Sequence, residues 1–291
     1  MPPRWSGMRI IAVPLTTRVV ASFQAGTNTI LPLTYYHFHT PPPNPEDKKT
    51  LLKKAIDKVE NLWAGFGKAP ERNWKRRVFV YGARLIDRID FEELSLKSLD
   101  PSFGPRIGQL WTEDPEKDAS LVTIPLYYPP SVYSGDGGMS PLAHMTLLLD
   151  KRTPHHKKGF YKWLFISPLT APFALIPIIP NLPFFYCAWR AWSHYQAWKA
   201  SEYMQGLIAT KHVVEEPSSL LDDIYVNNRP QEEPFQSDEK PGESKSKSAH
   251  PHLLLSVDGV PKIVEVFSLA SGAKADITRA IEQARVRIEK P

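Results

Sequence analysis

The sequence predicts a mixed α+β protein, with a small sheet and packed helices plus a proline-rich apolar helical hairpin that is membrane-associated. Short β-branched runs alternate with segments whose apolar residues recur every three or four positions, which predicts both strands and amphipathic helices. One 27-residue segment, 163–189, has no ionisable side chain except Tyr186 and Cys187. The mean hydropathy of the chain is only −0.32, so this segment belongs to an otherwise polar protein.

The amino-acid composition limits which partners and which kinds of site the protein can have. The 291 residues carry a formal net charge of +5, which suits an acidic surface such as anionic lipid or nucleic acid. A single cysteine, Cys187, excludes an internal disulfide and a cysteine-cluster metal site. The 29 prolines limit helix length and imply many extended connections.

Residues 1–160 contain the predicted α+β region. Strands are expected at 8–15, 18–24 and 121–128, and amphipathic helices at 46–63 and 74–89. Pro125 suggests that the last strand lies at a sheet edge, because proline cannot donate to a strand ladder. The arginines between 76 and 88 are interpreted as a solvated helix face rather than a lipid or nucleic-acid surface.

The beginning of the chain has two interpretations. No acidic residue precedes Glu46, whereas Arg4, Arg9 and Arg18 do, which is typical of a mitochondrial presequence. The run 8–15 is also apolar and β-branched, as in the first strand of a fold. The two interpretations are compatible if the targeting signal is internal.

Residues 161–211 are predicted to form the apolar hairpin and an aromatic helix. Five prolines argue against one straight transmembrane helix, and their densest cluster, 177–183, predicts a turn between two arms. The first arm, about 14 residues long, rises only ~21 Å, less than the ~30 Å hydrocarbon core. This favours a re-entrant or interfacial hairpin. The residues assigned to the membrane are Trp163, Pro168, Pro172, Pro177, Pro180, Asn181, Pro183 and Trp189.

Charged and aromatic side chains frame the hairpin. Residues 142–162 are expected to be helical apart from Pro154, and 184–211 to form a helix rich in Trp and Tyr, which concentrate at membrane–water interfaces. The positive-inside rule places the basic residues before the hairpin on the non-translocated side. This basic collar consists of Lys151, Arg152, His155, His156, Lys157, Lys158 and Lys162.

Arg190 and His194 are the candidate functional residues. They are four positions apart and therefore share a helix face. A charge just inside an apolar segment is a candidate for ion or proton coupling, whereas anchoring or packing is the stronger alternative. No phosphate loop, nucleophile elbow or His-Glu-x-x-His motif occurs, and the adjacent pair His155–His156 diverges on a helix. No catalytic, cofactor-binding or metal-binding residue is therefore assigned.

The C-terminal part of the chain divides into three segments of different amino-acid composition. Residues 212–228 form a connector, and 229–251, rich in Pro, Glu, Ser and Lys, are predicted to be a disordered linker. Residues 252–291 form a small C-terminal module with an amphipathic helix at 275–288. Because about 40 residues rarely support a core alone, we expect this module to dock on the main body or on a partner.

Four segments together resemble the mitochondrial K+–H+ exchange-related family. They are 9–15, 73–93, 168–186 and the continuation Arg-Ala-Trp-Ser-His-Tyr at 190–195. The resemblance implies an inner-membrane protein with the bulk of its chain facing the matrix. It also implies an assembly role in large complexes needed for active potassium–proton exchange, with LETM1-like proteins as partners.

The sequence therefore predicts a non-enzymatic inner-membrane subunit or assembly factor supporting mitochondrial potassium–proton exchange and volume homeostasis, with neither nucleic acid nor a small-molecule substrate as partner. One broken apolar segment is too little membrane protein for an alternating-access carrier with two repeats. The competing hypothesis is a soluble or peripheral scaffold that uses the apolar hairpin as a buried interaction element.

Overall fold

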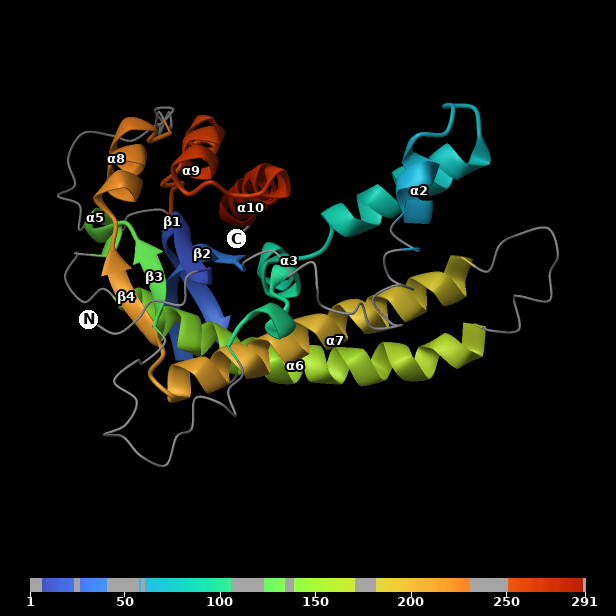
Figure 1. The fold of residues 1–291 in the computed structure, drawn as a ribbon, viewed down its shortest axis with the longest axis horizontal. Coiled ribbons are helices and arrows are strands. Elements are labelled where there is room, and N and C mark those ends of the chain that lie inside the picture. Colours follow the sequence, from blue (N-terminus) through green and yellow to red (C-terminus); the bar gives the residue numbers. More distant parts are fainter. Residues whose placement is uncertain are drawn as a thin grey trace, which may run out of the picture. The chain divides into compact units, whose positions relative to one another are not determined.

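The computed structural model describes residues 7–23, 27–40, 58, 61–105, 123–133, 139–170, 182–230 and 251–289. They belong to two compact units, one made of 1–40 with 91–291 and the other of 41–90. The larger unit combines a four-stranded sheet with helices, so the predicted mixed α+β class is confirmed (Figure 1). The separate unit within 1–160 was not predicted from the sequence.

The sheet has the strand order β2-β1-β3-β4. β1 pairs antiparallel with β2 and parallel with β3, and β3 pairs parallel with β4. The strand bounds are β1 Arg9–Phe23, β2 Thr27–His39, β3 Ile124–Tyr128 and β4 Val213–Pro217. The two strands expected before residue 25 are one strand, whose register with β2 shifts between Pro14 and Arg18.

The prediction that Pro125 marks a sheet edge is wrong, because β3 lies between β1 and β4. The backbone N–H of Ile124 donates to the His212 carbonyl oxygen, beside β4 (2.8 Å). Successive residues of a strand alternate in direction, so the nitrogen of Pro125 faces β1. Pairing with β1 begins only at Leu126. The proline therefore removes no bond from the ladder.

Helices cover both faces of the sheet, and the buried residues of β1 explain this arrangement. Its odd residues Ile11, Val13 and Leu15 are buried in one core, which includes residues of α8, α9 and α10. Its even residues, such as Ile10 and Ala12, are buried in a second core with residues of α3, α6 and α7. Because successive strand side chains alternate between faces, a strand apolar at every position needs cover on both. Figure 1 shows these helices on opposite sides of the sheet.

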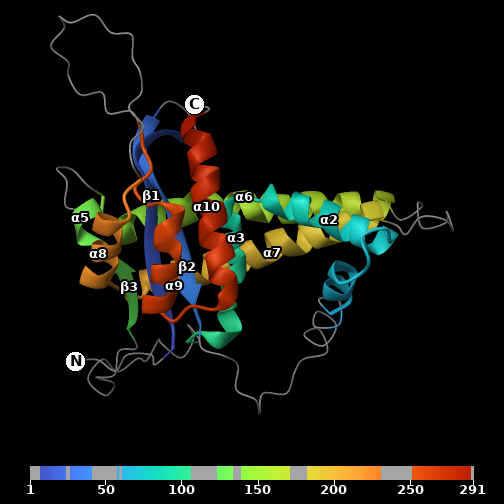
Figure 2. The ribbon, with the colours of Figure 1, turned by 90° about the horizontal axis from the view of Figure 1, so that it is seen from above.

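Two helices of the larger unit, α6 and α7, are much longer than the others. Figures 1 and 2 show α6 and α7 lying side by side as a long antiparallel pair that extends beyond the sheet. The bounds are α3 Phe91–Ser98, α5 Pro130–Tyr133, α6 Pro141–Thr170, α7 Leu182–Ala209, α8 Ser219–Asn227, α9 Val260–Val266 and α10 Ser271–Glu289. Two 3₁₀ turns, Pro101–Phe103 and Val257–Gly259, also lie in this unit.

The expected break at Pro154 is wrong, because α6 continues through both Pro154 and Pro168. A helix-interior proline removes one hydrogen bond and costs about 3 kcal/mol, so other contacts must offset it. Packing against α7 provides them. In addition, the Thr153 hydroxyl bonds to the Leu149 carbonyl oxygen (2.8 Å) beside the affected turn. Hence α6 begins well before the charges at 151–162.

The smaller unit is a pair of helical segments held by aromatic rings. Residues 61–67 are helical, and α2 spans Trp74–Asp87, with Asn73 as its N-cap. The rings of Trp63 and Phe79 lie 5.2 Å apart, and a Cβ added at Gly82 would come within 2.3 Å of Trp63. The predicted amphipathic helix at 74–89 is therefore confirmed, whereas most of the one expected at 46–63 lies outside the described residues.

The C-terminal module packs on the sheet. α10 contributes Ile277, Ile281 and Ala284 to the core that contains Leu15 and Tyr35. The backbone N–H of Leu254 donates to the Leu15 carbonyl oxygen (2.9 Å). Within the described residues, the expected docking is therefore onto the main body. The sequence did not predict β4, which lies in the segment interpreted as a connector, and most of the linker at 229–251 is not among the described residues.

Candidate functional site

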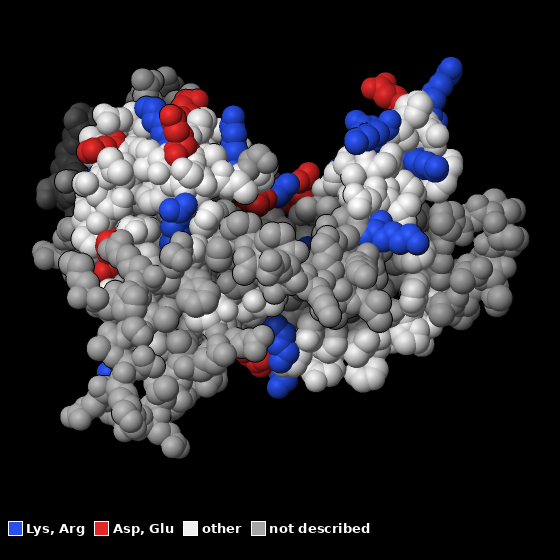
Figure 3. All heavy atoms as spheres, in the orientation of Figure 1, with Lys and Arg blue, Asp and Glu red and all other residues white. Residues whose placement is uncertain are grey.

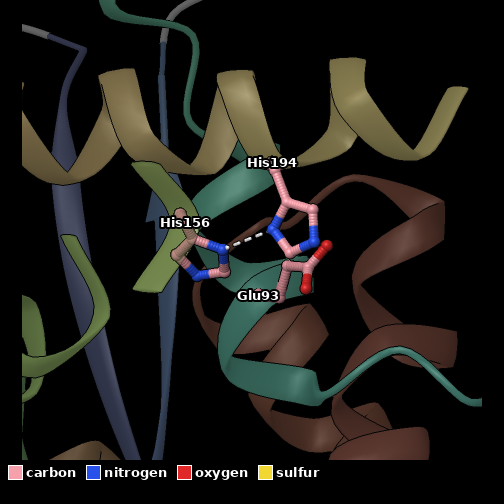
Figure 4. Close-up of side chains that lie close together, drawn as sticks. All are labelled: Glu93, His156 and His194. Atoms are coloured by element: carbon pink, nitrogen blue, oxygen red, sulfur yellow. Dashed lines mark hydrogen bonds between the residues drawn. The ribbon is translucent and has the colours of Figure 1, made fainter. Parts of the chain in front are cut away.

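Three helices from distant parts of the sequence bring a buried carboxylate and two imidazoles together. Glu93 comes from α3, His156 from α6 and His194 from α7, and all three are buried. Each offers one ligand atom, and these atoms lie within 4.8 Å of one another. Figure 4 shows the His194 ring between the ring of His156 and the carboxylate of Glu93.

Glu93 is held by two groups of α7. Two guanidinium nitrogens of Arg190 donate to the Glu93 carboxylate: Nη1 to Oε1, and Nη2 to Oε2 at 3.0 Å. The Ser193 hydroxyl donates to Oε1 at 2.9 Å. Burial acts to raise the pKa of Glu93, but the hydrogen bond and charge of Arg190 outweigh it and lower the pKa below its ordinary value. Glu93 is therefore an ionised carboxylate fixed in position.

His156 and His194 face each other across the α6–α7 interface. Their Nδ1 atoms are 3.1 Å apart, so one ring must donate and the other accept. Burial lowers the pKa of His156 to about 3 and also lowers that of His194, which keeps both rings neutral at pH 7. A Cβ added at Gly159 would come within 2.7 Å of the His194 ring, so glycine is what allows this close approach.

Further charged groups surround the cluster and are themselves paired. Arg152 of α6 forms an ion pair with Glu92, and Arg287 of α10 approaches the same carboxylate at 3.8 Å. Lys97 lies over the ring of Trp189 at 5.2 Å, and burial lowers the pKa of Lys97. Three helices, α3, α6 and α7, are thus connected through buried polar contacts, and α10 is linked to them through Glu92.

The structure brings together part of what the sequence predicted. Arg190 and His194 lie on one face of α7, as expected, and this face points at α3 and α6. Sequence reasoning missed Glu93, because nothing distinguishes it from its neighbour Glu92 in a chain of alternating charges. It also placed His156 and Arg152 in the basic collar, without predicting the contacts that the structure gives them. His156 is fully buried, and Arg152 is paired with Glu92.

The far end of the α6–α7 pair carries an exposed apolar stripe. Its residues follow the spacing i, i+3, i+4, i+7, i+8 along one face of α6. Apolar residues with this spacing normally face the core of a protein. The stripe consists of Tyr161, Leu164, Phe165, Pro168 and Leu169, and Phe165 and Leu169 are 72% and 75% exposed. Phe185 of α7 adds a further exposed ring. In Figure 3 the surface over this end of α6 shows no charged residue.

The residues that the sequence analysis assigned to the membrane differ in exposure at the far end of the α6–α7 pair. Pro168 and Pro183 are exposed, whereas Trp163 and Trp189 are half-buried, and the rings of Trp163 and Tyr186 pack edge to face (5.6 Å). Pro172, Pro177, Pro180 and Asn181 lie outside the described residues, and so does the proposed turn. Within the described residues, no helix combines the length and the apolar character needed to cross a membrane.

Two curated proteins match the chain along most of its length. An uncharacterized protein of Saccharomyces cerevisiae is 26% identical over 286 residues, covering 90% of this chain and 85% of the yeast protein. An uncharacterized protein of Schizosaccharomyces pombe is 26% identical over 221 residues, covering 74% of this chain and 81% of its own length. No solved structure matches the chain significantly.

A family model matches the chain over a longer range than the four short segments that resemble this family. The match, to the family described as mitochondrial K+-H+ exchange-related, runs from residue 9 to residue 208. It therefore includes β1, the buried cluster and nearly all of the α6–α7 pair. The chain belongs to the mitochondrial K+–H+ exchange-related family.

Proposed function

We propose that this chain is a non-enzymatic subunit or assembly factor that supports potassium–proton exchange and volume homeostasis at the mitochondrial inner membrane. The observation that carries the proposal is the exposed apolar stripe at the end of the α6–α7 pair, in a chain of this family. Its sheet and remaining helices face the matrix. Its partners are the membrane and other proteins of the exchange system, among them LETM1-like proteins.

The geometry of the stripe favours insertion into one leaflet. From Trp163 to Thr170, α6 is about 12 Å long, well short of a ~30 Å hydrocarbon core. Lys157 and Lys158, both exposed, precede the stripe on the same helix, and the exposed Lys162 directly follows its first residue, Tyr161. Amphipathic segments with this combination of basic and apolar residues lie in the interface, with the apolar face ~5–10 Å deep and the lysines at anionic headgroups.

The first experiment tests membrane attachment. Mitochondria carrying the tagged chain are extracted with alkaline carbonate, and retention in the membrane pellet is the expected result. The double substitution Phe165→Ser with Leu169→Ser should release the chain into the supernatant, because it removes the two most exposed apolar side chains of the stripe. Leu220→Ser is the matched control, since Leu220 is 60% exposed on α8 in the same unit.

The second experiment tests the role in exchange. Mitochondria lacking the chain should swell less in potassium acetate, because net uptake of that salt depends on exchange of potassium for protons. Swelling at the normal rate would contradict the proposed function. Restoration by the wild-type chain, but not by the Phe165→Ser, Leu169→Ser variant, would connect the stripe to the function.

A scaffold that uses the same stripe against a protein is the second candidate. The observation in its favour is that the stripe has the width and spacing of a helix–helix contact. In that case the wild-type chain would be released by carbonate, and the purified chain would remain monodisperse without detergent. The serine variant would then lose a protein partner and not the membrane.

A further inference from the structure

We propose that Glu93, His156 and His194 form a binding site for one Zn2+ ion between α3, α6 and α7. Two imidazoles and one carboxylate are a ligand set that proteins use for zinc, with the fourth position open to water. All three residues are buried, and their ligand atoms lie within 4.8 Å of one another. The proposal concerns the buried cluster and does not depend on the membrane stripe or on the proposed role in exchange.

The spacing of the two imidazoles is the first argument. Two nitrogens bound to a tetrahedral zinc ion at 2.0–2.1 Å lie about 3.3 Å apart. The Nδ1 atoms of His156 and His194 are 3.1 Å apart, so they need only separate by about 0.2 Å. One ligand atom from each of the three residues lies within 4.8 Å of the other two, so the largest shortening needed to reach that spacing is about 1.5 Å, which side-chain rotations of the three residues can share.

The second argument is the state of the rings. Zinc binds neutral imidazole, and competition with protons is what usually weakens binding near neutral pH. Deep burial already favours the neutral rings here. The two facing Nδ1 atoms share a single proton, so one of them donates and the other accepts. An ion in place of the shared proton would use both facing nitrogens as acceptors.

The third argument concerns how the ligands are held. Ser193 and Arg190 fix the carboxylate of Glu93, as outer residues commonly do for metal ligands. Gly159 leaves room for the His194 ring. Both oxygens of Glu93 accept from Arg190, so turning Oε2 to the ion would break one of the two bonds and leave Oε1 held by Arg190 and Ser193.

The charge of Arg190 acts against the ion and sets the expected affinity. A guanidinium within bonding distance of a ligand repels a divalent cation, and Arg152 and Lys162 add to the positive potential at the two histidines. Arg190→Gln removes this repulsion but keeps a donor for Glu93. This variant should therefore bind Zn2+ more tightly than the wild type, by at least tenfold, which a purely structural role of Arg190 would not produce.

The test uses the purified full chain after treatment with a chelator. Isothermal titration with Zn2+ alone should give one ion per chain, and Zn2+ should raise the melting temperature because it binds the folded state. His156→Gln and His194→Gln should weaken binding at least a hundredfold. His252→Gln is the control, since His252 is exposed and hydrogen-bonds to Thr17 on β1, and it should leave the affinity unchanged.

A spectroscopic measurement on the wild type avoids dependence on variants that fold poorly. Co2+ in place of Zn2+ should give the intense visible absorption of a tetrahedral site with nitrogen and oxygen ligands, and Zn2+ should abolish it. The proposal would be overturned by absence of saturable binding in the wild type, by an octahedral Co2+ spectrum, or by unchanged affinity in a folded His194→Gln variant. Any of these would leave the two histidines as a hydrogen-bonded packing pair.

Discussion

Arg190 on α7 binds both carboxylate oxygens of Glu93 on α3, across 97 residues of sequence. Glu93 is 3% exposed and Arg190 18%, so neither charge is well solvated. The pair joins the long α6–α7 helices to the part of the chain that covers the sheet. This finding favours packing over ion coupling as the primary role of Arg190. Packing was also the stronger of the two alternatives that the sequence offered.

Arg190→Ala should lower the free energy of unfolding by about 3–5 kcal/mol, because it leaves the buried charge of Glu93 without its partner. Denaturant unfolding of the purified chain measures this. Arg285→Ala, which removes an exposed ion pair with Glu282, is the control and should change stability by less than about 0.5 kcal/mol. In mitochondria, normal abundance of Arg190→Ala with lost exchange would instead support ion coupling.

Gly159→Ala should destabilise the protein, although alanine is usually the better helix residue. The added Cβ would meet the His194 ring at 2.7 Å, and relieving that overlap costs about 1–3 kcal/mol. Gly272→Ala is the control, because a Cβ there meets nothing within 4 Å, and it should gain about 0.5 kcal/mol. Thermal unfolding of both variants gives the comparison, and equal shifts would contradict the close packing of His194 on α6.

The pair of His144 and Tyr36 should make stability depend on pH. His144 Nδ1 lies 2.7 Å from the Tyr36 hydroxyl, and burial lowers the pKa of His144 from 6.5 to about 4. Between these values the unfolded chain binds more protons than the folded one, so this stabilisation is present above pH 6.5 and is lost as the pH falls towards 4. At pH 5 the loss is about 2 kcal/mol.

His144→Gln should remove that share of the pH dependence. The difference in unfolding free energy between pH 7 and pH 5 should be smaller in the variant than in the wild type by about 1–2 kcal/mol. His252→Gln, at an exposed position, should leave the difference unchanged. A variant with the full wild-type pH dependence would show that His144 is not buried as a neutral ring.

Ile281→Ala should test whether the C-terminal module is part of the main core. Ile281 is fully buried in the core that contains Leu15 and Tyr35, and truncation of such a side chain costs about 2–5 kcal/mol. Val286→Ala on the same helix is the control, since Val286 is 49% exposed. If α10 were an independent module, Ile281→Ala would leave the cooperative unfolding of the sheet unchanged.

Local patterns were sufficient for several elements. The helical spacing at 74–89 predicted α2, and the apolar run at 8–15 predicted the start of β1. The helix expected at 184–211 is observed as α7. These predictions succeed because amphipathic spacing reports which face of an element will be buried. They fail for Pro154, where packing between two long helices outweighs the local preference of proline.

The sequence by itself determined the mixed α+β class, the helix that follows the proline cluster and the family, since each depends on residues close together in the chain or on a recognisable order of segments. Only the tertiary structure decided the strand order, the cover on both faces of β1 and the cluster of Glu93, His156 and His194. The physical reason is that these features depend on how helices far apart in sequence pack together. No local pattern in the chain records which buried glutamate will meet which histidines.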